Sequence, residues 1–83
     1  MRVVLEHVSG IAGGNLERAK VEMNRVLDFR GSVTGVKAKG TRMLVDFEIN
    51  PQWDMTQAEK ESYLKEWIPA KMKLVFRVVS VSS

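Results

Sequence analysis

The chain contains no cysteine, one histidine and two prolines among its 83 residues. The absence of cysteine excludes disulfides, cysteine zinc sites and thiol chemistry, and it argues against a disulfide-stabilised secreted mini-protein. The single histidine, His7, lies in a valine-rich segment and has no second imidazole with which to share a metal ion, so we interpret it as structural. We therefore predict no catalytic residue, no metal site and no cofactor.

Long apolar runs are also absent. No stretch approaches the length that crosses a membrane. Glu6 and His7 interrupt the apolar residues of the N-terminal segment MRVVLEHVSG. Because a signal peptide needs a longer apolar run, this segment is not typical of one. These observations predict a cytoplasmic protein without a membrane partner.

What is present is typical of one small globular domain covering residues 1–83. Hydrophobic residues make up 45% of the chain and charged residues 28%, which gives no indication of disorder. A chain this short buries only about 60% of its unfolded surface, so we expect one core and modest stability. The net charge of +3 is compatible with nucleic-acid binding and equally with an ordinary soluble protein.

Residue patterns predict four strands and two helices. Segments that are rich in β-branched residues, or that alternate apolar and polar residues, indicate strands, and apolar residues at helical spacing indicate helices. The strands are expected at residues 2–8, 32–38, 42–49 and 73–81, and the helices at residues 16–29 and 56–68.

Particular residues are expected to set the helix ends. Asn15 is a suitable N-cap for the first helix, and Gly31 is free to adopt the left-handed conformation that often follows a helix. Thr56 and Glu59 have the spacing of a capping box at the start of the second helix. Pro69 is expected to stop that helix.

The order strand–helix–strand–strand–helix–strand is that of the ferredoxin-like plait. In this α+β fold, two split strand–helix–strand units form one antiparallel sheet with both helices on one face. The right-handed crossover rule and a short hairpin around Lys39-Gly40 favour this arrangement. The alternative is a sheet with the same elements in a different strand order.

In a plait, three connections meet at one edge of the domain: the glycine-rich loop 9–15, the hairpin turn, and the connection after the second helix. Glycines and a helix N-terminus present backbone N–H groups to an anion, and lysine and arginine add positive charge. The candidate anion- or nucleic-acid-binding residues are Gly13, Gly14, Asn15, Lys37, Lys39, Arg42, Lys71 and Lys73. The alternative interpretation is that exposed loops collect lysine and glycine without any ligand.

The helix-free face of the expected sheet differs from that of RNA-recognition domains. Those domains place aromatic residues on the central strands, where bases stack on them. Here the alternation of strand 42–49 places Asp46 and Glu48 on that face. Because carboxylates repel phosphate, this pattern argues against RNA binding by the sheet.

The first and last strands are apolar on both sides, which indicates a second covering layer. The candidate interface residues are Val4, Val8, Val75, Arg77, Val79 and Val81. A second copy of the chain or another protein would cover them, with charged residues pairing across a two-fold axis. The alternative is that these valines are isolated surface residues without consequence.

The two tryptophans are expected to pack against the core. Trp67 lies beside Ile68 at the end of the second helix, which predicts a core position. Trp53 lies in a loop, and we expect it to plug one end of the core, with an exposed anchor for a partner as the alternative.

The segment GSVTGVKAKG, residues 31–40, resembles the second-strand region of acylphosphatases, which share this element order and size. The resemblance implies a phosphate cradle in the first strand-to-helix loop, with an arginine from that loop. The loop SGIAGGN holds no arginine, and the next one, Arg18, lies inside the expected helix. Acylphosphatase-like chemistry is therefore our least favoured hypothesis. In size and character the chain also resembles small accessory proteins of bacteriophages.

We predict a non-enzymatic binding domain, acting as a dimer, that contacts nucleic acid or another polyanion through its basic edge. The alternative is a protein–protein interaction module, such as an accessory or inhibitor protein, that works through the valine-rich sheet.

Overall fold

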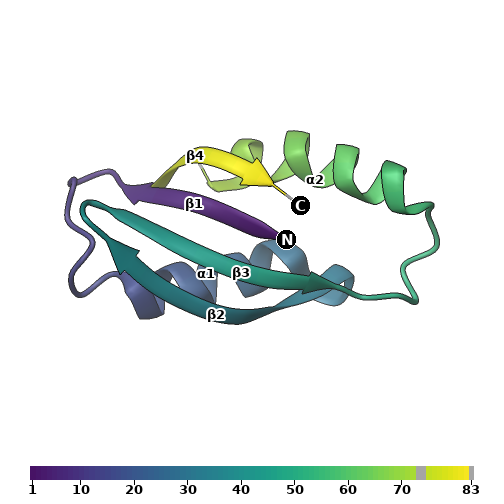
Figure 1. Cartoon of the computed structure of the whole chain (residues 1–83), viewed down its shortest axis with the longest axis horizontal. Coiled ribbons are helices and arrows are strands. Elements are labelled where there is room, and N and C mark those ends of the chain that lie inside the picture. The colour runs from purple at the N-terminus through teal and green to yellow at the C-terminus, as the bar shows by residue number, and fades with distance from the viewer. Residues whose placement is uncertain (73–74, 83) are drawn as a thin grey trace.

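The computed structural model describes residues 1–72 and 75–82. These residues form the elements β1 (Arg2–His7), α1 (Leu16–Leu27), the 3-10 turn η1 (Asp28–Arg30), β2 (Gly31–Lys39), β3 (Arg42–Ile49), α2 (Gln57–Met72) and β4 (Phe76–Ser82), shown in Figure 1. The strands lie in the order β2-β3-β1-β4, and each neighbouring pair is antiparallel. The predicted ferredoxin-like plait is confirmed, with its strand order.

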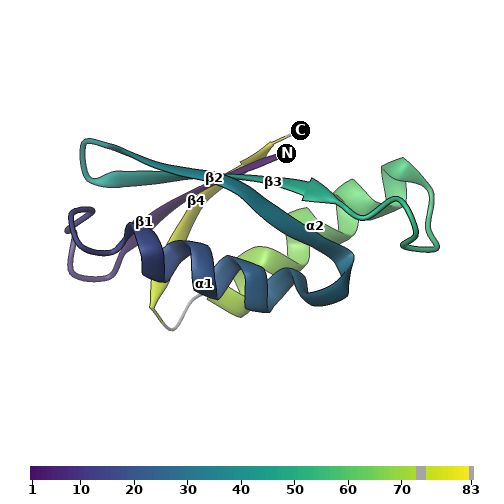
Figure 2. The ribbon, with the colours of Figure 1, turned by 90° about the horizontal axis from the view of Figure 1, so that it is seen from below.

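Both helices lie on the same face of the sheet, as Figure 2 shows, and the core fills the space between them and the sheet. The inward side chains of the two central strands, Val3, Leu5, Met43 and Val45, have no exposed surface. Burying a side chain of this size stabilises the fold by roughly 1.5–3 kcal/mol. The helices contribute a second apolar layer: Ala19, Met23, Val26, Leu27, Leu64, Ile68 and Met72.

The ends of α1 differ from the prediction. The Asn15 side chain does not cap the helix; its amide Nδ2 donates to the Ile11 carbonyl oxygen at 2.8 Å, which closes the preceding loop. At the other end, Asp28 rather than Gly31 leaves the helical conformation, with a φ of 53°, while its backbone N–H donates to the Asn24 carbonyl oxygen. Aspartate tolerates positive φ better than most residues. The chain then turns into η1 before it reaches β2.

Gly31 is required because its backbone lies close to the backbone of β3, and not because it forms a left-handed turn. Its φ is 179°, an extended conformation that any residue adopts. It begins β2 opposite Ile49, and a Cβ atom at this position would overlap the backbone carbonyl group of Glu48. The glycine therefore allows β2 to pair with the end of β3.

The start of α2 is as predicted, and its end is not. Thr56 and Glu59 form the capping box, because the Glu59 backbone N–H donates to Thr56 Oγ1 at 3.2 Å and the two side chains are hydrogen-bonded at 2.8 Å. Pro69 does not stop the helix, which continues to Met72. The donor that proline lacks would have served the carbonyl group of Lys65, a solvent-exposed residue that water can reach.

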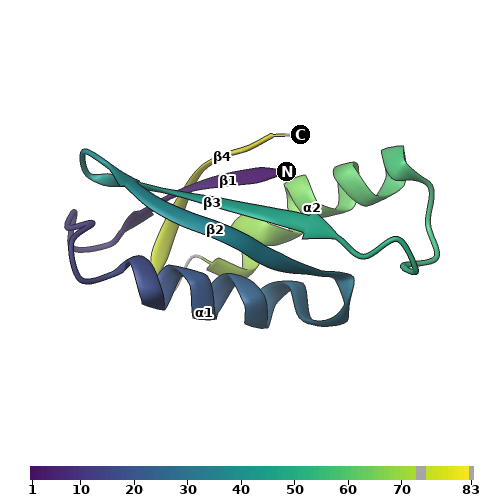
Figure 3. The ribbon, with the colours of Figure 1, turned by 60° about the horizontal axis from the view of Figure 1, so that its bottom comes forward.

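The β2–β3 hairpin has a two-residue turn, Gly40-Thr41, between Lys39 and Arg42. Gly40 has a φ of 64°, in the region that short hairpin turns require and that glycine adopts without strain. Figures 1 and 3 show that this hairpin and the β1–α1 loop lie at one end of the long axis of the domain. The loop before α2 lies at the other end.

Two register shifts change which side chains share a face. One lies in β2 between Val33 and Gly35, where the Val33 backbone N–H donates instead to Asn24 Oδ1 of α1 at 2.9 Å. The other lies in the β1–β4 ladder, where Val4 pairs with Ser80 and Leu5 with Val78, so that Val79 is the extra residue. A bulge of this kind reverses the alternation of the strand beyond it.

The close contact at Gly31 generates a prediction for stability. Gly31→Ala should lower the free energy of unfolding by about 1–3 kcal/mol, because the added methyl group must displace the β3 backbone. Urea unfolding measures this change. Gly35→Ala is the matched control in the same strand, since a Cβ atom there meets nothing within 4 Å. Equal stability of the two variants would contradict the explanation.

Candidate functional site

The side of the sheet that carries no helix (Figure 2) is here called the open face. The strand registers arrange its side chains in rows that run across the strands. The row nearest the hairpin turn comprises, in the order β2-β3-β1-β4, Lys39, Arg42, Glu6 and Arg77. The next row comprises Lys37, Leu44, Val4 and Ser80, and the third comprises Gly35, Asp46, Arg2 and Ser82. The cations therefore gather at the hairpin end of the open face.

Ion pairs within the chain bind Glu6 and Asp46, two carboxylates of the open face. Arg77 Nη2 lies 2.8 Å from one oxygen of Glu6, and Arg42 Nε lies 3.9 Å from the other. In the third row, Arg2 donates to both oxygens of Asp46 at 2.7 and 3.2 Å. Three of the charges expected to pair with a second copy, Glu6, Asp46 and Arg77, thus have partners in the same chain. Of the two carboxylates from which we predicted repulsion of phosphate, Asp46 is offset by Arg2, and Glu48 is exposed.

The hydrogen bonds from Arg2 lower the pKa of Asp46 below its usual range. Partial burial opposes this shift, and the positive charges of Arg2, Lys37 and the N-terminus add to it. The same contact raises the pKa of Arg2. Asp46 is therefore ionised at neutral pH and held against Arg2.

The predicted anion-binding residues separate into groups in the structure. Lys37, Lys39 and Arg42 lie together, and with Arg77 they form what we call the basic cluster. Lys71 lies instead on α2, where it faces Arg18 and Arg25 of α1 across a hollow. Lys73 lies outside the described residues.

In the glycine-rich loop, Asn15 is engaged in hydrogen bonds within the chain. Gly13 and Gly14 are exposed at the same end of the domain as the hairpin. Asn15 uses its side chain within the loop, and its backbone N–H donates to the Ala12 carbonyl oxygen at 3.0 Å. Glu17 adds a negative charge to the first turn of α1. Anion binding by the backbone of Gly13 and Gly14 stays a prediction.

The predicted valine interface is corrected by the register shift in β4. Val81 pairs with Val3 and packs against the core. Val75 precedes β4 and also packs against the core, so neither residue belongs to the open face. Val4 remains on the open face, beside Leu44 in the second row. Val79 lies at the bulge.

The remaining predicted interface residues are not part of one apolar surface. Val8 is 65% exposed and lies in the loop beyond β1. Arg77 belongs to the basic cluster. His7, predicted to be structural, packs edge-on against the Phe76 ring, and its Nδ1 accepts the Ser9 backbone N–H at 3.1 Å.

An aromatic cluster at the opposite end of the domain was not anticipated. The Arg30 guanidinium lies 4.6 Å from the centre of the Phe29 ring and 4.7 Å from that of Trp67. Tyr63 and Trp53 lie 5.7 and 5.8 Å away. Trp53 and Trp67 are both half-buried against the core, and Trp53 holds the loop before α2 in place. The aromatic residues are visible in the sequence, but their convergence around Arg30 could not be predicted from it.

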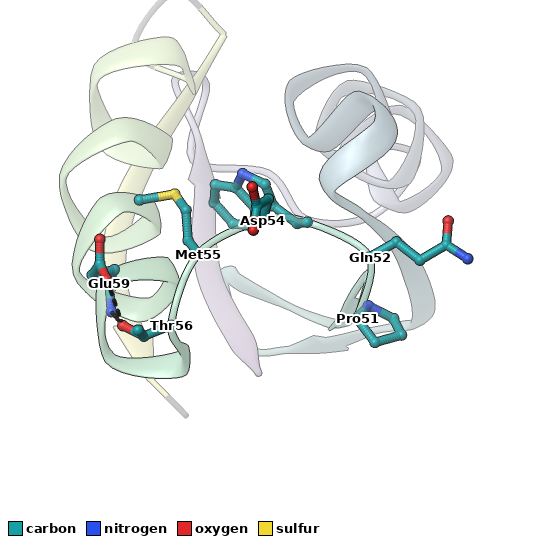
Figure 4. Close-up of a pocket in the computed structure, with 7 residues that line it drawn as sticks. Pro51, Gln52, Asp54, Met55, Thr56 and Glu59 are labelled. Atoms are coloured by element: carbon teal, nitrogen blue, oxygen red, sulfur yellow. Dashed lines mark hydrogen bonds between the residues drawn. The ribbon is translucent and has the colours of Figure 1, made fainter.

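The loop before α2 surrounds a hollow of about 500 Å³ lined by residues 51–56 and Glu59 (Figure 4). Thr56 is already engaged in the capping box, and Gln52 points away from the loop. Among residues 1–72 and 75–82, no group of three histidine, cysteine, aspartate or glutamate side chains is placed to hold a metal ion. We assign no chemistry to this hollow.

The segment that resembles acylphosphatases forms β2 and the first turn residue, Gly40. Arg18 lies in α1, as expected, and lines the hollow between the helices. Comparison of the chain with protein families, curated proteins and solved structures finds no significant match. Within the described ranges, no helix is long and apolar enough to cross a bilayer.

The Arg2–Asp46 contact generates a prediction for titration. Because the pKa of Asp46 is lowered on folding, its contribution to stability is present above the ordinary carboxyl pKa of about 4. That contribution is lost as the pH falls through the lowered value. Arg2→Met should return the Asp46 pKa toward its ordinary range, which NMR titration of the carboxyl carbon measures. Arg77→Met, which leaves the Arg2 contact intact, is the control, and an unchanged pKa in Arg2→Met would refute the assignment.

Proposed function

We propose that this chain binds the phosphate backbone of nucleic acid through the basic cluster Lys37, Lys39, Arg42 and Arg77. The observation that carries the proposal is the placement of these four cations in two adjoining rows of the open face, with Glu6 as the one carboxylate among those two rows. Positive charge concentrated on one surface attracts a polyanion and raises its rate of association.

Glu6 organises the two arginines of the cluster. Its carboxylate lies between Arg42 and Arg77, and it is the less exposed partner in both ion pairs, at 22% against 55% and 69%. A guanidinium carries five N–H donors, so each arginine retains donors that Glu6 does not occupy. Because both arginine side chains are more than half exposed, a phosphate can approach them from solvent.

The open face favours contact with the backbone over reading of bases. Its described side chains include no aromatic ring on which a base could stack, because Phe47 and Phe76 are buried on the other side. Contacts to phosphate carry no sequence information. We therefore propose that this face binds nucleic acid without sequence specificity. We place this function in the cytoplasm, the compartment that the composition suggested.

The basic cluster generates a prediction for salt dependence. The double variant Lys39→Gln/Arg42→Gln should bind duplex DNA more weakly, with a slope of log affinity against log salt that is shallower by up to about 1.8, or roughly 0.9 for each lost phosphate contact. Fluorescence anisotropy between low and physiological salt measures the slope. Lys20→Gln/Lys65→Gln is the matched control, since both residues are exposed on helices away from the open face.

Two outcomes would contradict the proposal. One is undetectable binding of both DNA and RNA at low salt. The other is an equal loss of slope in the control variant, which would show that net charge alone sets the affinity and that the cluster has no special role.

Self-association through the open face is the second candidate function. The observation that favours it is the adjacent, half-buried pair Val4 and Leu44, on a face that no described helix covers. Two copies stacked on this face would bury both pairs, and the basic clusters would lie near the edge of the contact. The apolar area is smaller than the sequence indicated, because Val75 and Val81 belong to the core.

Sedimentation tests the second candidate. A dimer held by the open face should dissociate in Leu44→Glu, because the added carboxylate would be buried without a partner, and should persist in Val8→Glu, which lies outside that face. A monomer at high concentration in the unmodified chain would eliminate this candidate.

A further inference from the structure

Residues of α1 and α2, the two helices that lie on the side of the sheet opposite the open face (Figure 2), line a groove. It consists of two adjoining hollows of about 250 and 220 Å³, both lined by Arg25 and Lys71. Trp67 lines the first hollow, and Arg18 and Glu22 line the second. We call these five residues the interhelix groove. None of them belongs to the basic cluster.

The interhelix groove is positively charged. Arg18, Arg25 and Lys71 contribute three cations, and Glu22 is the one carboxylate among its residues. Arg25 binds Glu22 at 2.8 Å, but its side chain remains 76% exposed, so most of the guanidinium surface faces solvent. An anion entering the groove therefore meets cations from both helices.

Trp67 is held in position at one end of this charged groove. Its ring centre lies 5.5 Å from that of Tyr63 and 4.7 Å from the Arg30 guanidinium, and the indole is half-buried. The side chain also lines the first hollow, together with Arg25 and Lys71. An aromatic side chain and two cations thus border the same space.

We propose that the interhelix groove binds single-stranded nucleic acid, with a phosphate at Arg25 and Lys71 and an unpaired base against Trp67. Proteins that bind single strands combine a basic groove along the backbone with aromatic rings on which bases stack. A base within a duplex is stacked on its neighbours and cannot take this position. The proposal rests on nucleic acid being the partner, and it adds a second surface that distinguishes single strands from duplexes.

The test uses the fluorescence of Trp67 in the full chain. Trp53→Phe leaves Trp67 as the sole tryptophan while keeping an aromatic ring beside Tyr63. Titration with a short oligothymidylate at low salt should quench this fluorescence, and a duplex of equal length should quench it far less. Lys71→Gln in the same background should weaken binding and make the salt slope shallower by about 0.7, the value for one phosphate contact on a single strand.

Matched variants separate binding from folding. Lys65→Gln changes an exposed lysine of the same helix that does not line the groove, and it should bind like the parent. Trp67→Leu should lower the affinity for single strands by about 5- to 100-fold. Trp67 also packs against the core, so the circular dichroism and melting temperature of the Trp67→Leu variant are measured alongside. If Trp67→Leu unfolds, the result for Lys71→Gln decides the test.

The outcomes distinguish this proposal from the previous one. Binding of oligothymidylate without a change in Trp67 fluorescence, and with unchanged affinity in Lys71→Gln, would overturn the groove and leave the basic cluster standing. A quench of equal size by polyglutamate at the same ionic strength would show an acidic-peptide site and would also overturn it. No binding of any nucleic acid would overturn both proposals.

Discussion

The pairing of β1 with β3 is the constraint on which both faces of the sheet depend. One register places Val3 opposite Val45 and Leu5 opposite Met43, so the fully buried side chains meet beneath the helices. The same register places the intervening residues opposite one another on the open face, where arginines meet carboxylates. A slip of one residue would exchange the two sets and bury charge without compensation. The core therefore fixes the pattern of charge, although the ion pairs are exposed and contribute little stability themselves.

The fold was predictable because each level of the sequence indicated the same arrangement. Alternation along residues 42–49, helical spacing after Asn15 and the Thr56–Glu59 capping box all agree with the observed elements. Strand order followed from connectivity, since a plait with short connections satisfies the rule of right-handed crossovers. Helix ends were less predictable. Gly31 was assigned to a helix end, whereas its role is close contact with the β3 backbone, which only tertiary structure reveals.

The candidate surfaces were predictable only in part, because strict alternation does not hold along two of the strands. In β4 the bulge at Val79 turns Val81 to the core side, so a stripe of valines that looked continuous is divided between two faces. In β2 the shift lies beside Val33, whose backbone N–H donates to the side chain of Asn24, nine residues earlier on α1. The bulge in β4 has no signature in the local sequence, whereas Gly35 inside β2 is a residue that often marks a bulge. Lys37, Lys39 and Arg42 were nevertheless found together because they flank one tight turn, which local sequence does specify.

The prediction that the second helix ends at Pro69 is wrong, and this explains why the interhelix groove was not foreseen. A helix that stops at proline leaves Lys71 in a loop beside the hairpin, and this placement led to a single basic edge. In the structure α2 continues to Met72, so Lys71 lies one turn beyond Trp67 and two beyond Tyr63, on one stripe of the helix. On α1, Arg18 and Arg25 are two turns apart and line the opposite wall of the groove. Proline in the last turn is tolerated where the carbonyl group that it leaves without a donor is exposed to water. The spacing of Tyr63, Trp67 and Lys71 was therefore present in the sequence, and the length of α2 gives it a structural meaning.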